Sequence, residues 1–339
     1  MDREETPLKP GDVVADRYEV IEELGRGSYG IVFRAVQLGI GRDVALKTLL
    51  PDTGVGSEER KRFEREALVV SRFNHPNIVT LYDFGDHEGT LFMVMEYVEG
   101  RELKEVIDTE APLAPERVRA ITYQMLDALQ YAHDQGVVHR DLKPENIHLL
   151  RNPSMEADEA EAVKVLDFGI AKFVHGEEEG SALDTLTQTG VAMGTPQYMS
   201  PENITGDPVT HHADLYAVGL LMYEMLVGET AFTGESPHEV MVSHIKDDAP
   251  TLPQTVEMEP FSRGLQWALR KQPDERVASA KHLRQILEED APEPVVEPQN
   301  IDPFPEVAPA KQTNLVKPLA AVAVAALVVI ILLLLVLLQ

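Results

Sequence analysis

The sequence predicts an α+β protein, with a small β-rich N-terminal part, a larger α-rich C-terminal part and one C-terminal transmembrane helix. Short segments rich in β-branched and aromatic residues dominate residues 18–50, whereas helical spacing of apolar residues dominates after Pro115. Residues 319–338 form a run of 20 without a charge. The chain of 339 residues, 44% of them hydrophobic, is long enough for one large folded domain.

The composition excludes several classes of protein. The chain has no cysteine, so disulfide frameworks, thiol catalysis and cysteine-ligated metal sites are excluded. The formal net charge is −27, from 57 acidic and 30 basic residues. We expect no nucleic-acid partner, because phosphates are bound by Lys and Arg. The acidic surface is interpreted as simple solvation, with a preference for basic substrates as the alternative.

Residues 18–98 are expected to form the small β-rich part, after a lead-in of residues 1–17. The predicted strands, which are rich in β-branched or aromatic residues, cover residues 18–24, 31–37, 43–49, 81–84 and 90–97. Between the third and fourth of these strands, residues 58–73 have helical spacing, with Ser57 as the N-cap.

Residues 99–289 are expected to form the larger α-rich part. Its best helical patterns cover residues 116–135, 214–228 and 279–289. An acidic and polar segment at residues 152–161 is predicted to form a solvated loop between two strands, with a regulatory or docking role as the alternative.

The C-terminal residues are predicted to anchor the chain in the cell membrane. Residues 291–318 hold seven prolines, so residues 290–318 are expected to form an extended linker. A helix over residues 319–338 would span about 30 Å, the thickness of the bilayer core, and it lacks the polar stripe of a buried core helix. Because the chain opens without an apolar signal and Lys311 and Lys317 precede this helix, we expect a single crossing with the N-terminal part in the cytoplasm.

A glycine-rich segment, Gly25-Arg26-Gly27-Ser28-Tyr29-Gly30, is the first candidate for chemistry. Glycines at this spacing occur in dinucleotide-binding units, where a helix follows them, and in hairpins whose backbone N–H groups cover phosphates. Here a strand-like segment, residues 31–36, follows the glycines. The hairpin is therefore the favoured interpretation.

Lys47 ends an apolar segment, Val44-Ala45-Leu46-Lys47. A lysine is costly to bury unless it is paired, and Glu66 in the next predicted helix is a suitable acid. Either residue alone is as consistent with a solvated surface.

Three further motifs favour a functional role for Lys47 and Glu66 over a solvated surface. They are His139-Arg140-Asp141-Leu142-Lys143-Pro144-Glu145-Asn146, then Asp167-Phe168-Gly169, and then Gly194-Thr195-Pro196-Gln197-Tyr198-Met199-Ser200-Pro201-Glu202. A carboxylate such as Asp141 can accept a hydroxyl proton, and a lysine such as Lys143 can hold a phosphoryl group. The oxygens of Asn146 and Asp167 are suitable ligands for Mg²⁺.

The five motifs follow the order found in eukaryotic-like protein kinases, and the chain resembles that family from about residue 18 to residue 289. The segment that ends in Pro201-Glu202 is most similar to bacterial Ser/Thr kinases, many of which are bound to the membrane by one helix after a linker. The resemblance implies a bilobal protein-kinase fold, with lobes at about 18–98 and 99–289. It also implies ATP and Mg²⁺ (or Mn²⁺) as cofactors.

The resemblance implies a role for each matching residue. Lys47 holds the α- and β-phosphates and pairs with Glu66, Asp141 orients and deprotonates the substrate hydroxyl, Lys143 contacts the γ-phosphate, and Asn146 and Asp167 ligate Mg²⁺. The residues implied around ATP are Gly25, Arg26, Gly27, Ser28, Tyr29, Gly30, Val32, Ala45, Lys47, Met95, Glu96, Val98, Glu102, His148 and Leu166. Among these, Met95 is the implied gatekeeper, the backbone of Glu96 and Val98 binds adenine, and Glu102 reaches the ribose. The family usually has Leu or Met at the position of His148, and protonation of this imidazole would weaken ATP binding at low pH.

The resemblance also suggests how activity is regulated. Lys143 and Thr195 are typical of Ser/Thr rather than tyrosine kinases. Kinases with an arginine at the position of Arg140 commonly need a phosphate on the activation segment, and Thr187 and Thr189 are the candidates. We expect autophosphorylation there, possible in trans within a homodimer, with proteins that carry Ser or Thr as substrates. The resemblance further implies a bracing ion pair, Glu202 with Arg276, and support of the catalytic loop by Asp214.

Two other functions are considered. A membrane-anchored pseudokinase scaffold would bind ATP or partners without transfer, but such proteins usually lose the equivalent of Lys47, Asp141 or Asp167. A small-molecule phosphotransferase usually lacks a full activation segment ending in Pro-Glu. Protein Ser/Thr kinase activity is therefore the favoured function.

Overall fold

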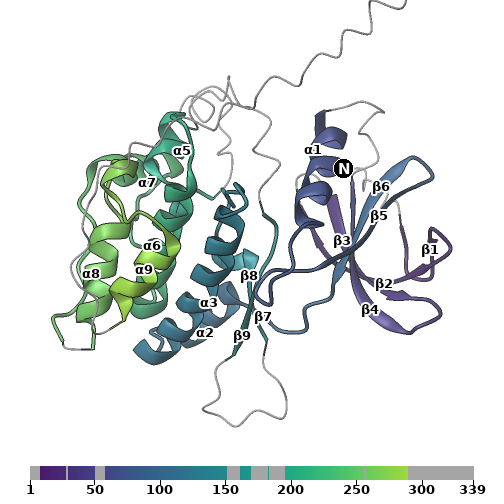
Figure 1. Cartoon of the computed structure of the whole chain (residues 1–339), viewed down its shortest axis with the longest axis horizontal. Helices are drawn as coiled ribbons and strands as arrows, with labels where there is room; N and C mark the ends of the chain where they lie inside the picture. The colour runs from purple at the N-terminus through teal and green to yellow at the C-terminus, as the bar shows by residue number, and fades with distance from the viewer. Residues whose placement is uncertain are drawn as a thin grey trace, which may run out of the picture. The chain divides into compact units, whose positions relative to one another are not determined.

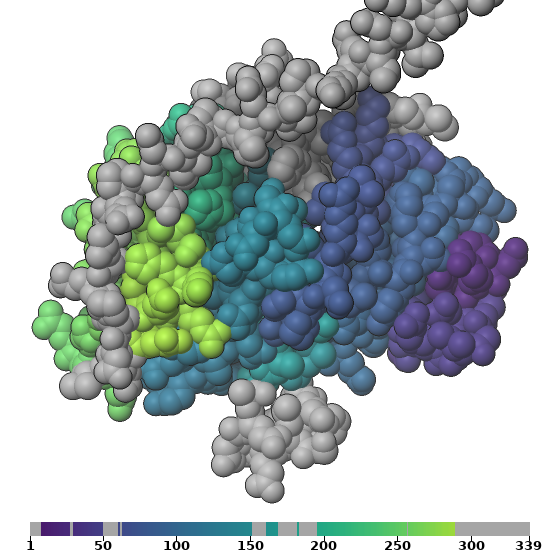
Figure 2. Space-filling view, viewed as in Figure 1, coloured from purple at the N-terminus to yellow at the C-terminus, as the bar shows by residue number. Residues whose placement is uncertain are grey.

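The structure is a computed structural model that describes residues 8–27, 30–49, 58–150, 161–168, 182, 195–255 and 257–288. These residues form two lobes, a β-sheet lobe followed by a helical lobe (Figure 1). The predicted bilobal α+β architecture is confirmed. Figure 2 shows, on one face, the purple-to-blue surface of the first lobe in contact with the teal-to-yellow surface of the second.

The N-terminal lobe is built on a six-stranded antiparallel sheet with the order β1-β2-β3-β4-β6-β5. The strands are β1 (Val13–Val14), β2 (Tyr18–Arg26), β3 (Gly30–Gln37), β4 (Arg42–Leu49), β5 (Leu81–His87) and β6 (Thr90–Glu96). All five predicted strands are present, and β5 continues to His87 instead of ending at residue 84. On one face of the sheet, Phe33 and Leu46 are buried in an apolar cluster, as the alternation of side chains along a strand requires.

One helix, α1 (Glu58–Val70), packs against this sheet. Phe63 and Ala67 of α1 lie in an apolar cluster with Leu49 and Met93 of the strands. The helix ends three residues before the predicted residue 73. Glu66 lies three residues after Phe63 and one before Ala67, so its side chain is on the face of α1 that packs against the sheet.

The C-terminal lobe consists of helices around α6, with a small sheet at the boundary between the lobes. Its helices are α2 (Leu103–Glu110), α3 (Pro115–His133), α5 (Pro201–Thr205), α6 (His211–Val227), α7 (Pro237–Lys246), α8 (Glu259–Ala268) and α9 (Ala280–Leu287), with 3-10 turns at Pro144–Asn146, Pro196–Tyr198 and Pro273–Glu275. The small sheet has the order β7-β8-β9, formed by Arg101–Glu102, Ile147–Leu150 and Ala162–Val165. The helices predicted at 116–135, 214–228 and 279–289 correspond to α3, α6 and α9, with ends shifted by one to three residues.

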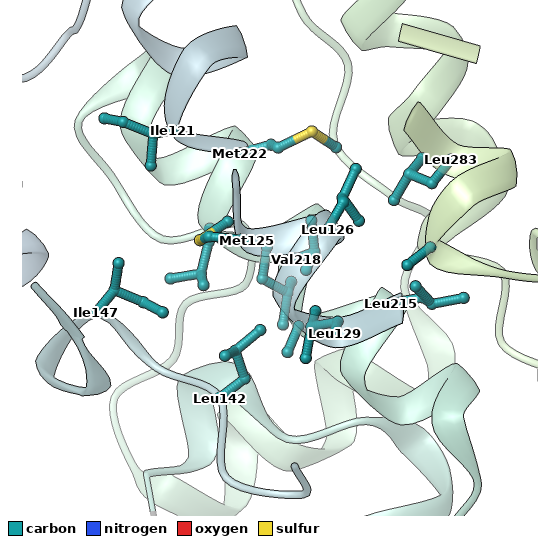
Figure 3. Packing of buried hydrophobic residues seen from close by; sticks show 14 of the residues in the cluster. Ile121, Met125, Leu126, Leu129, Leu142, Ile147, Leu215, Val218, Met222 and Leu283 are labelled. Atoms are coloured by element: carbon teal, nitrogen blue, oxygen red, sulfur yellow. The ribbon is translucent and has the colours of Figure 1, made fainter. Parts of the chain in front are cut away.

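Helix α6 is the centre of the lobe, since 13 of its 17 residues are buried. Figure 3 shows Leu215, Val218 and Met222 of α6 packed among Met125 and Leu129 of α3. Gly219 lets α6 approach α8 closely, because a Cβ atom at this position would lie 2.8 Å from the Leu269 side chain. The tightly packed core fixes the loops that begin and end on α3 and α6.

The membrane prediction concerns residues that the structure does not describe. In the described part of the chain, no helix is long and apolar enough to span a bilayer. The predicted linker at 290–318 and the predicted transmembrane helix at 319–338 lie outside the described residues. Residues 152–160 of the acidic segment also lie outside them, while the strands on both sides, β8 and β9, are present as predicted.

His244 on α7 makes the stability of the lobe sensitive to acid. Its side chain is fully buried, its Nδ1 atom lies 3.0 Å from the Tyr216 hydroxyl, and its ring packs against Phe232. Burial, and then the charge of Lys271, lowers the pKa of His244 from 6.5 to about 3. Because the unfolded chain binds this proton at a higher pH than the folded chain does, the folded state loses stability as the pH falls below about 6.5.

We expect the free energy of unfolding to fall by about 1.4 kcal/mol per pH unit from this histidine alone, from about pH 6.5 toward about pH 3. Denaturant titrations at several pH values between about 7.5 and about 5 measure this slope. His244→Gln keeps a hydrogen-bonding group beside Tyr216 but has no group that titrates in this range. It should therefore lower the slope by about 1.4 kcal/mol per pH unit, which corresponds to one proton. The same slope in both proteins would contradict this assignment.

Candidate active site

Lys47, Glu66 and Asp167 meet where the two lobes face each other. The Nζ atom of Lys47, on β4, lies 2.8 Å from Oε1 of Glu66 on α1 and 3.1 Å from Oδ1 of Asp167 after β9. The side chains of Lys47 and Glu66 are 17% and 12% exposed, whereas that of Asp167 is 49% exposed. The structure thus pairs Lys47 with Glu66, and the third group keeps access to solvent.

The three charges control one another. Burial acts to lower the pKa of Lys47, but the charges of Asp167 and Glu66 outweigh it and raise the pKa above its ordinary value. The charge of Lys47 in turn holds the pKa of Asp167 below its ordinary value, while burial raises the pKa of Glu66 against the opposing effect of Lys47. Lys47 is therefore a fixed cation, and Asp167 is an ionised carboxylate that can bind a metal ion.

Asp141, Lys143 and Asn146 lie together on the loop between α3 and β8. Lys143 Nζ is 3.2 Å from Asp141 Oδ2. Asn146 is 7% exposed, and its Nδ2 atom donates to the backbone carbonyl oxygen of Asp141 at 2.8 Å. This hydrogen bond orients the Asn146 amide and leaves its side-chain oxygen as the atom for a metal ion.

Asp214, at the start of α6, binds the backbone of this loop. It is 1% exposed, and its carboxylate accepts the backbone N–H groups of His139 at 2.8 Å and Arg140 at 2.9 Å, together with Nε2 of His133 at 2.8 Å. Arg140 has a φ of 65°, in the left-handed region that a residue with a Cβ rarely adopts. Asp214 therefore stabilises a strained backbone directly before Asp141.

A second strained residue precedes Phe168, since Asp167 has a φ of 45°. Phe168 is 1% exposed and packs against Phe73 and His139, with ring centroids 5.1 Å and 4.7 Å apart. His139 also lies 2.9 Å from the carbonyl oxygen of Leu166 through Nε2. These contacts fix Asp167 beside Lys47 and the catalytic loop.

The described glycines lie at the end of β2 and at the start of β3, and these two strands pair antiparallel, as the hairpin interpretation predicts. The structure describes Gly25, Arg26, Gly27 and Gly30, while Ser28 and Tyr29 lie outside the described residues. The N–H of Gly27 donates to the carbonyl oxygen of Gly30 at 2.9 Å. A Cβ atom at Gly30 would overlap the Thr48 carbonyl oxygen, so this strand can approach β4 only with glycine.

Four of the residues expected around ATP share one face of the N-terminal sheet. Val32 lies opposite Lys47, and Ala45 lies opposite Met95, so these four side chains point to the same face. In the second lobe, His148 lies on β8 and Leu166 directly follows β9. Val98 follows β6, and the exposed Glu102 ends β7.

The side chains of His148 and Glu102 both have pKa values shifted from their ordinary values. Burial lowers the pKa of His148, and its buried Nδ1 atom has no hydrogen-bond partner among the residues that the structure describes. Burial, followed by the charges of Glu145 and Glu105, raises the pKa of Glu102. The lowered pKa favours a neutral His148 ring, which weakens the expectation that its protonation limits ATP binding.

The donor set fits a divalent cation. Asp167 offers a half-exposed carboxylate and Asn146 an amide oxygen, which are hard ligands of the type that Mg²⁺ prefers. In the ranges that the structure describes, no cluster of three or more His, Asp or Glu side chains is arranged as a metal site. A cation here would therefore depend on oxygens of a bound nucleotide or on water for its remaining ligands.

The structure describes the activation segment at Asp167 and Phe168, at Ala182, and from Thr195 onward. Gly169, Thr187, Thr189 and Gly194 lie outside the described residues. From Thr195 onward the chain is ordered into a 3-10 turn and α5, with Ser200 as the N-cap of α5.

The predicted ion pair between Glu202 and Arg276 is present. Two hydrogen bonds of 2.7 Å join the guanidinium and the carboxylate, and the two side chains are 0% and 2% exposed for Arg276 and Glu202. It ties the end of the activation segment to the segment before α9.

Sequence reasoning missed two contacts of the site. His133 binds Asp214 across 81 positions of the chain, and Lys164 on β9 forms an ion pair with Glu96 across 68 positions. His133 ends a long amphipathic helix, and Lys164 alternates with buried residues along a strand. Neither pattern carries a signal for its partner.

The sequence is similar to those of known protein kinases. Residues 18–289 match the family described as "Protein kinase domain". The chain is 40% identical over 283 residues to serine/threonine-protein kinase pkn3 of Myxococcus xanthus, covering 82% of this chain and 50% of the relative. It is 38% identical over 282 residues to serine/threonine-protein kinase PknB of Mycobacterium tuberculosis, covering 81% of this chain and 43% of the relative. The chain thus spans about half the length of these relatives.

A solved structure supports the same assignment. A mutant of the Mycobacterium tuberculosis PknI kinase domain superposes with a TM-score of 0.62 at 26% identity, covering 85% of this chain and all of that one. The two lobes, the paired Lys47 on β4, and both Asp141 and Asp167 of the second lobe lie within the region that matches the family. The chain belongs to the protein kinase family.

Proposed function

We propose that the chain is a serine/threonine protein kinase, which transfers the γ-phosphoryl group of ATP to Ser and Thr hydroxyls of proteins. The observation that carries the proposal is the contact of Lys47 with both Glu66 and Asp167, opposite the loop that holds Asp141 and Asn146. The similarity to proteins named serine/threonine-protein kinases supports the hydroxyl class.

In the proposed mechanism each residue acts on a different part of the substrates. Lys47, held by Glu66, orients the α- and β-phosphates, and Lys143 contacts the γ-phosphate. Asp141 orients the attacking hydroxyl and accepts its proton. Asn146 and Asp167 would hold Mg²⁺, which neutralises phosphate charge when bound.

The alternative function is that of a pseudokinase scaffold, which binds ATP or partners without transfer. No observation favours it, because Lys47, Asp141 and Asp167 are all retained. The Lys47–Glu66 pair is also formed, as an active kinase requires.

Phosphoamino-acid analysis tests the proposed function. The full-length chain is incubated with radiolabelled ATP, Mg²⁺ and a mixture of unphosphorylated proteins. We expect label on serine and threonine and none on tyrosine. Label mainly on tyrosine would refute the proposed substrate class, and ATP binding without label would favour the scaffold.

We also propose that the kinase is activated by autophosphorylation at Thr187 or Thr189. A phosphate would bring a charge of about −1.5 to −2 close to Arg140, which precedes the catalytic Asp141. Mass spectrometry of the active full-length chain should find phosphate on one or both threonines, and the Thr187→Ala/Thr189→Ala variant should be at least about tenfold less active. Active protein without phosphate at either position would exclude this switch.

We further propose that residues 319–338 anchor the kinase in the cell membrane, with the kinase domain in the cytoplasm and residues 290–318 as the linker. The uncharged run of 20 residues supports this proposal. After cell fractionation, the full-length chain should remain with membranes at alkaline pH, whereas a chain ending at residue 318 should be released. Release of both would contradict anchoring. A homodimer at the membrane would place two activation segments within reach of each other.

A further inference from the structure

The side chain of Lys164, on β9, extends to Glu96 at the end of β6, where the chain passes from one lobe to the other. Its Nζ atom lies 2.7 Å from Oε2 of Glu96 and donates to the carbonyl oxygen of Ile78 at 3.4 Å. The side chains of Lys164 and Glu96 are 13% and 23% exposed. Screening by solvent is therefore weaker than for a surface ion pair.

Glu96 is held by more than this ion pair. Its Oε2 atom also accepts the backbone N–H of Thr80 at 3.3 Å, and its own N–H donates to the Thr80 carbonyl oxygen at 2.8 Å. The segment before Thr80 is in turn paired with β9. The backbone N–H of Val79 donates to the carbonyl oxygen of Val165 at 3.1 Å, and the N–H of Val165 donates to the carbonyl oxygen of Asn77 at 2.8 Å. β9 and Glu96 are therefore connected in two ways. The backbone hydrogen bonds of residues 77–80 connect them indirectly, and the ion pair of Lys164 with Glu96 connects them directly.

The two ends of this connection belong to different parts of the proposed ATP site. Glu96 and Val98 are expected to bind adenine through their backbones, and β9 leads within three residues to Asp167 on the phosphate side. A charged side chain that spans these ends can set the position of the adenine-binding backbone relative to the phosphate-binding groups. Lys164 itself is paired with Glu96 and contacts none of Lys47, Asp141 or Asp167 in the hydrogen bonds of the described residues.

We propose that Lys164 is a positioning residue for the nucleotide, which holds the adenine-binding backbone in place through the carboxylate of Glu96. The inference rests on the proposed function of the site as an ATP site. It predicts a defect in the binding of the adenosine moiety, with the transfer step preserved.

The test compares two ligands, ATP and adenosine, on the full-length chain. In Lys164→Met we expect the KM for ATP to rise by about fivefold to tenfold, the effect of losing one partly buried ion pair, with kcat within about twofold. The dissociation constant of adenosine, measured by calorimetry without turnover, should rise by the same factor. Adenosine has no phosphate, so only a change at the adenine end can weaken it.

Three variants serve as matched controls. Lys164→Arg keeps the charge and should restore ATP and adenosine binding. Glu96→Gln should reproduce the defect, and adding Lys164→Met to it should have little further effect, because both changes remove the same interaction. Arg284→Met removes an ion pair with Asp127 between α9 and α3, and it should leave the KM for ATP unchanged.

Two results would overturn the inference. One is unchanged adenosine binding in Lys164→Met, which would make the ion pair a structural contact or one that acts at the phosphates. The other is an additive loss in the double variant, which would separate Lys164 from Glu96. Wild-type protein that binds adenosine but transfers no phosphate would refute the proposed function alone, since the calorimetric comparison would still decide the role of Lys164.

Discussion

Asp141→Asn is expected to lower kcat by about a thousandfold, within the range known for the loss of a positioned general base, with little change in the KM for ATP. The asparagine has the same shape, but its amide cannot accept the hydroxyl proton. The loop should keep its conformation, because Asn146 binds the backbone carbonyl oxygen of residue 141 and Asp214 binds the backbone before it. The loss would therefore report chemistry alone.

Steady-state kinetics and thermal unfolding of both proteins check this expectation. Equal unfolding temperatures show that the loop is intact. The matched variant is Asp127→Asn, an aspartate on α3 that pairs with Arg284 away from the site, and it should keep full activity. Asp141→Asn with activity within about tenfold of wild type would mean that another group takes the proton.

Arg276→Met is expected to destabilise the fold by about 3–5 kcal/mol, the cost of breaking a buried ion pair on one side. The guanidinium donates to both oxygens of Glu202 and to the carbonyl oxygens of Arg270, Lys271 and His212. None of the Arg276 side chain is exposed. Its removal leaves a buried carboxylate and three carbonyl groups without this donor.

Denaturant unfolding of two further variants separates the ion pair from the loss of packing. The double variant Arg276→Met/Glu202→Met removes both charges, and it should be more stable than Arg276→Met alone. Lys104→Met breaks the exposed pair with Asp108 on α2, and it should change the free energy of unfolding by less than about 1 kcal/mol. A loss below about 1 kcal/mol in Arg276→Met would show that the buried pair contributes no more than a surface pair.

The fold of the first lobe could be predicted strand by strand, because its strands are rich in β-branched and aromatic residues and glycines separate several of them. β1 was missed, since two residues carry no periodicity and the strand exists only through its pairing with β2. In the second lobe α3, α6 and α9 were predicted, while α2, α5, α7 and α8 were not. The α2 N-cap position, Glu102, makes no capping hydrogen bond through its side chain, so the usual start signal is absent.

The candidate site could be predicted as far as its motifs extend. The motifs identify Lys47 and Asp141, and the resemblance implies that Asp214 supports the catalytic loop, but part of the geometry depends on contacts that no motif marks, such as His133 with Asp214. The left-handed backbone at Arg140 and Asp167 could not be predicted either, because neither residue is a glycine. Tertiary contacts impose both conformations.

The central claim is that the Lys47–Glu66–Asp167 arrangement orients ATP for phosphoryl transfer. It is tested most directly by transfer of the labelled γ-phosphate from ATP to protein by the full-length chain, with Lys47→Met in parallel. The account predicts transfer by the wild type and a loss of at least about a hundredfold in the variant, because the phosphates lose their positioning charge. Transfer at the wild-type rate in Lys47→Met, or none in a wild type that binds ATP, would contradict it.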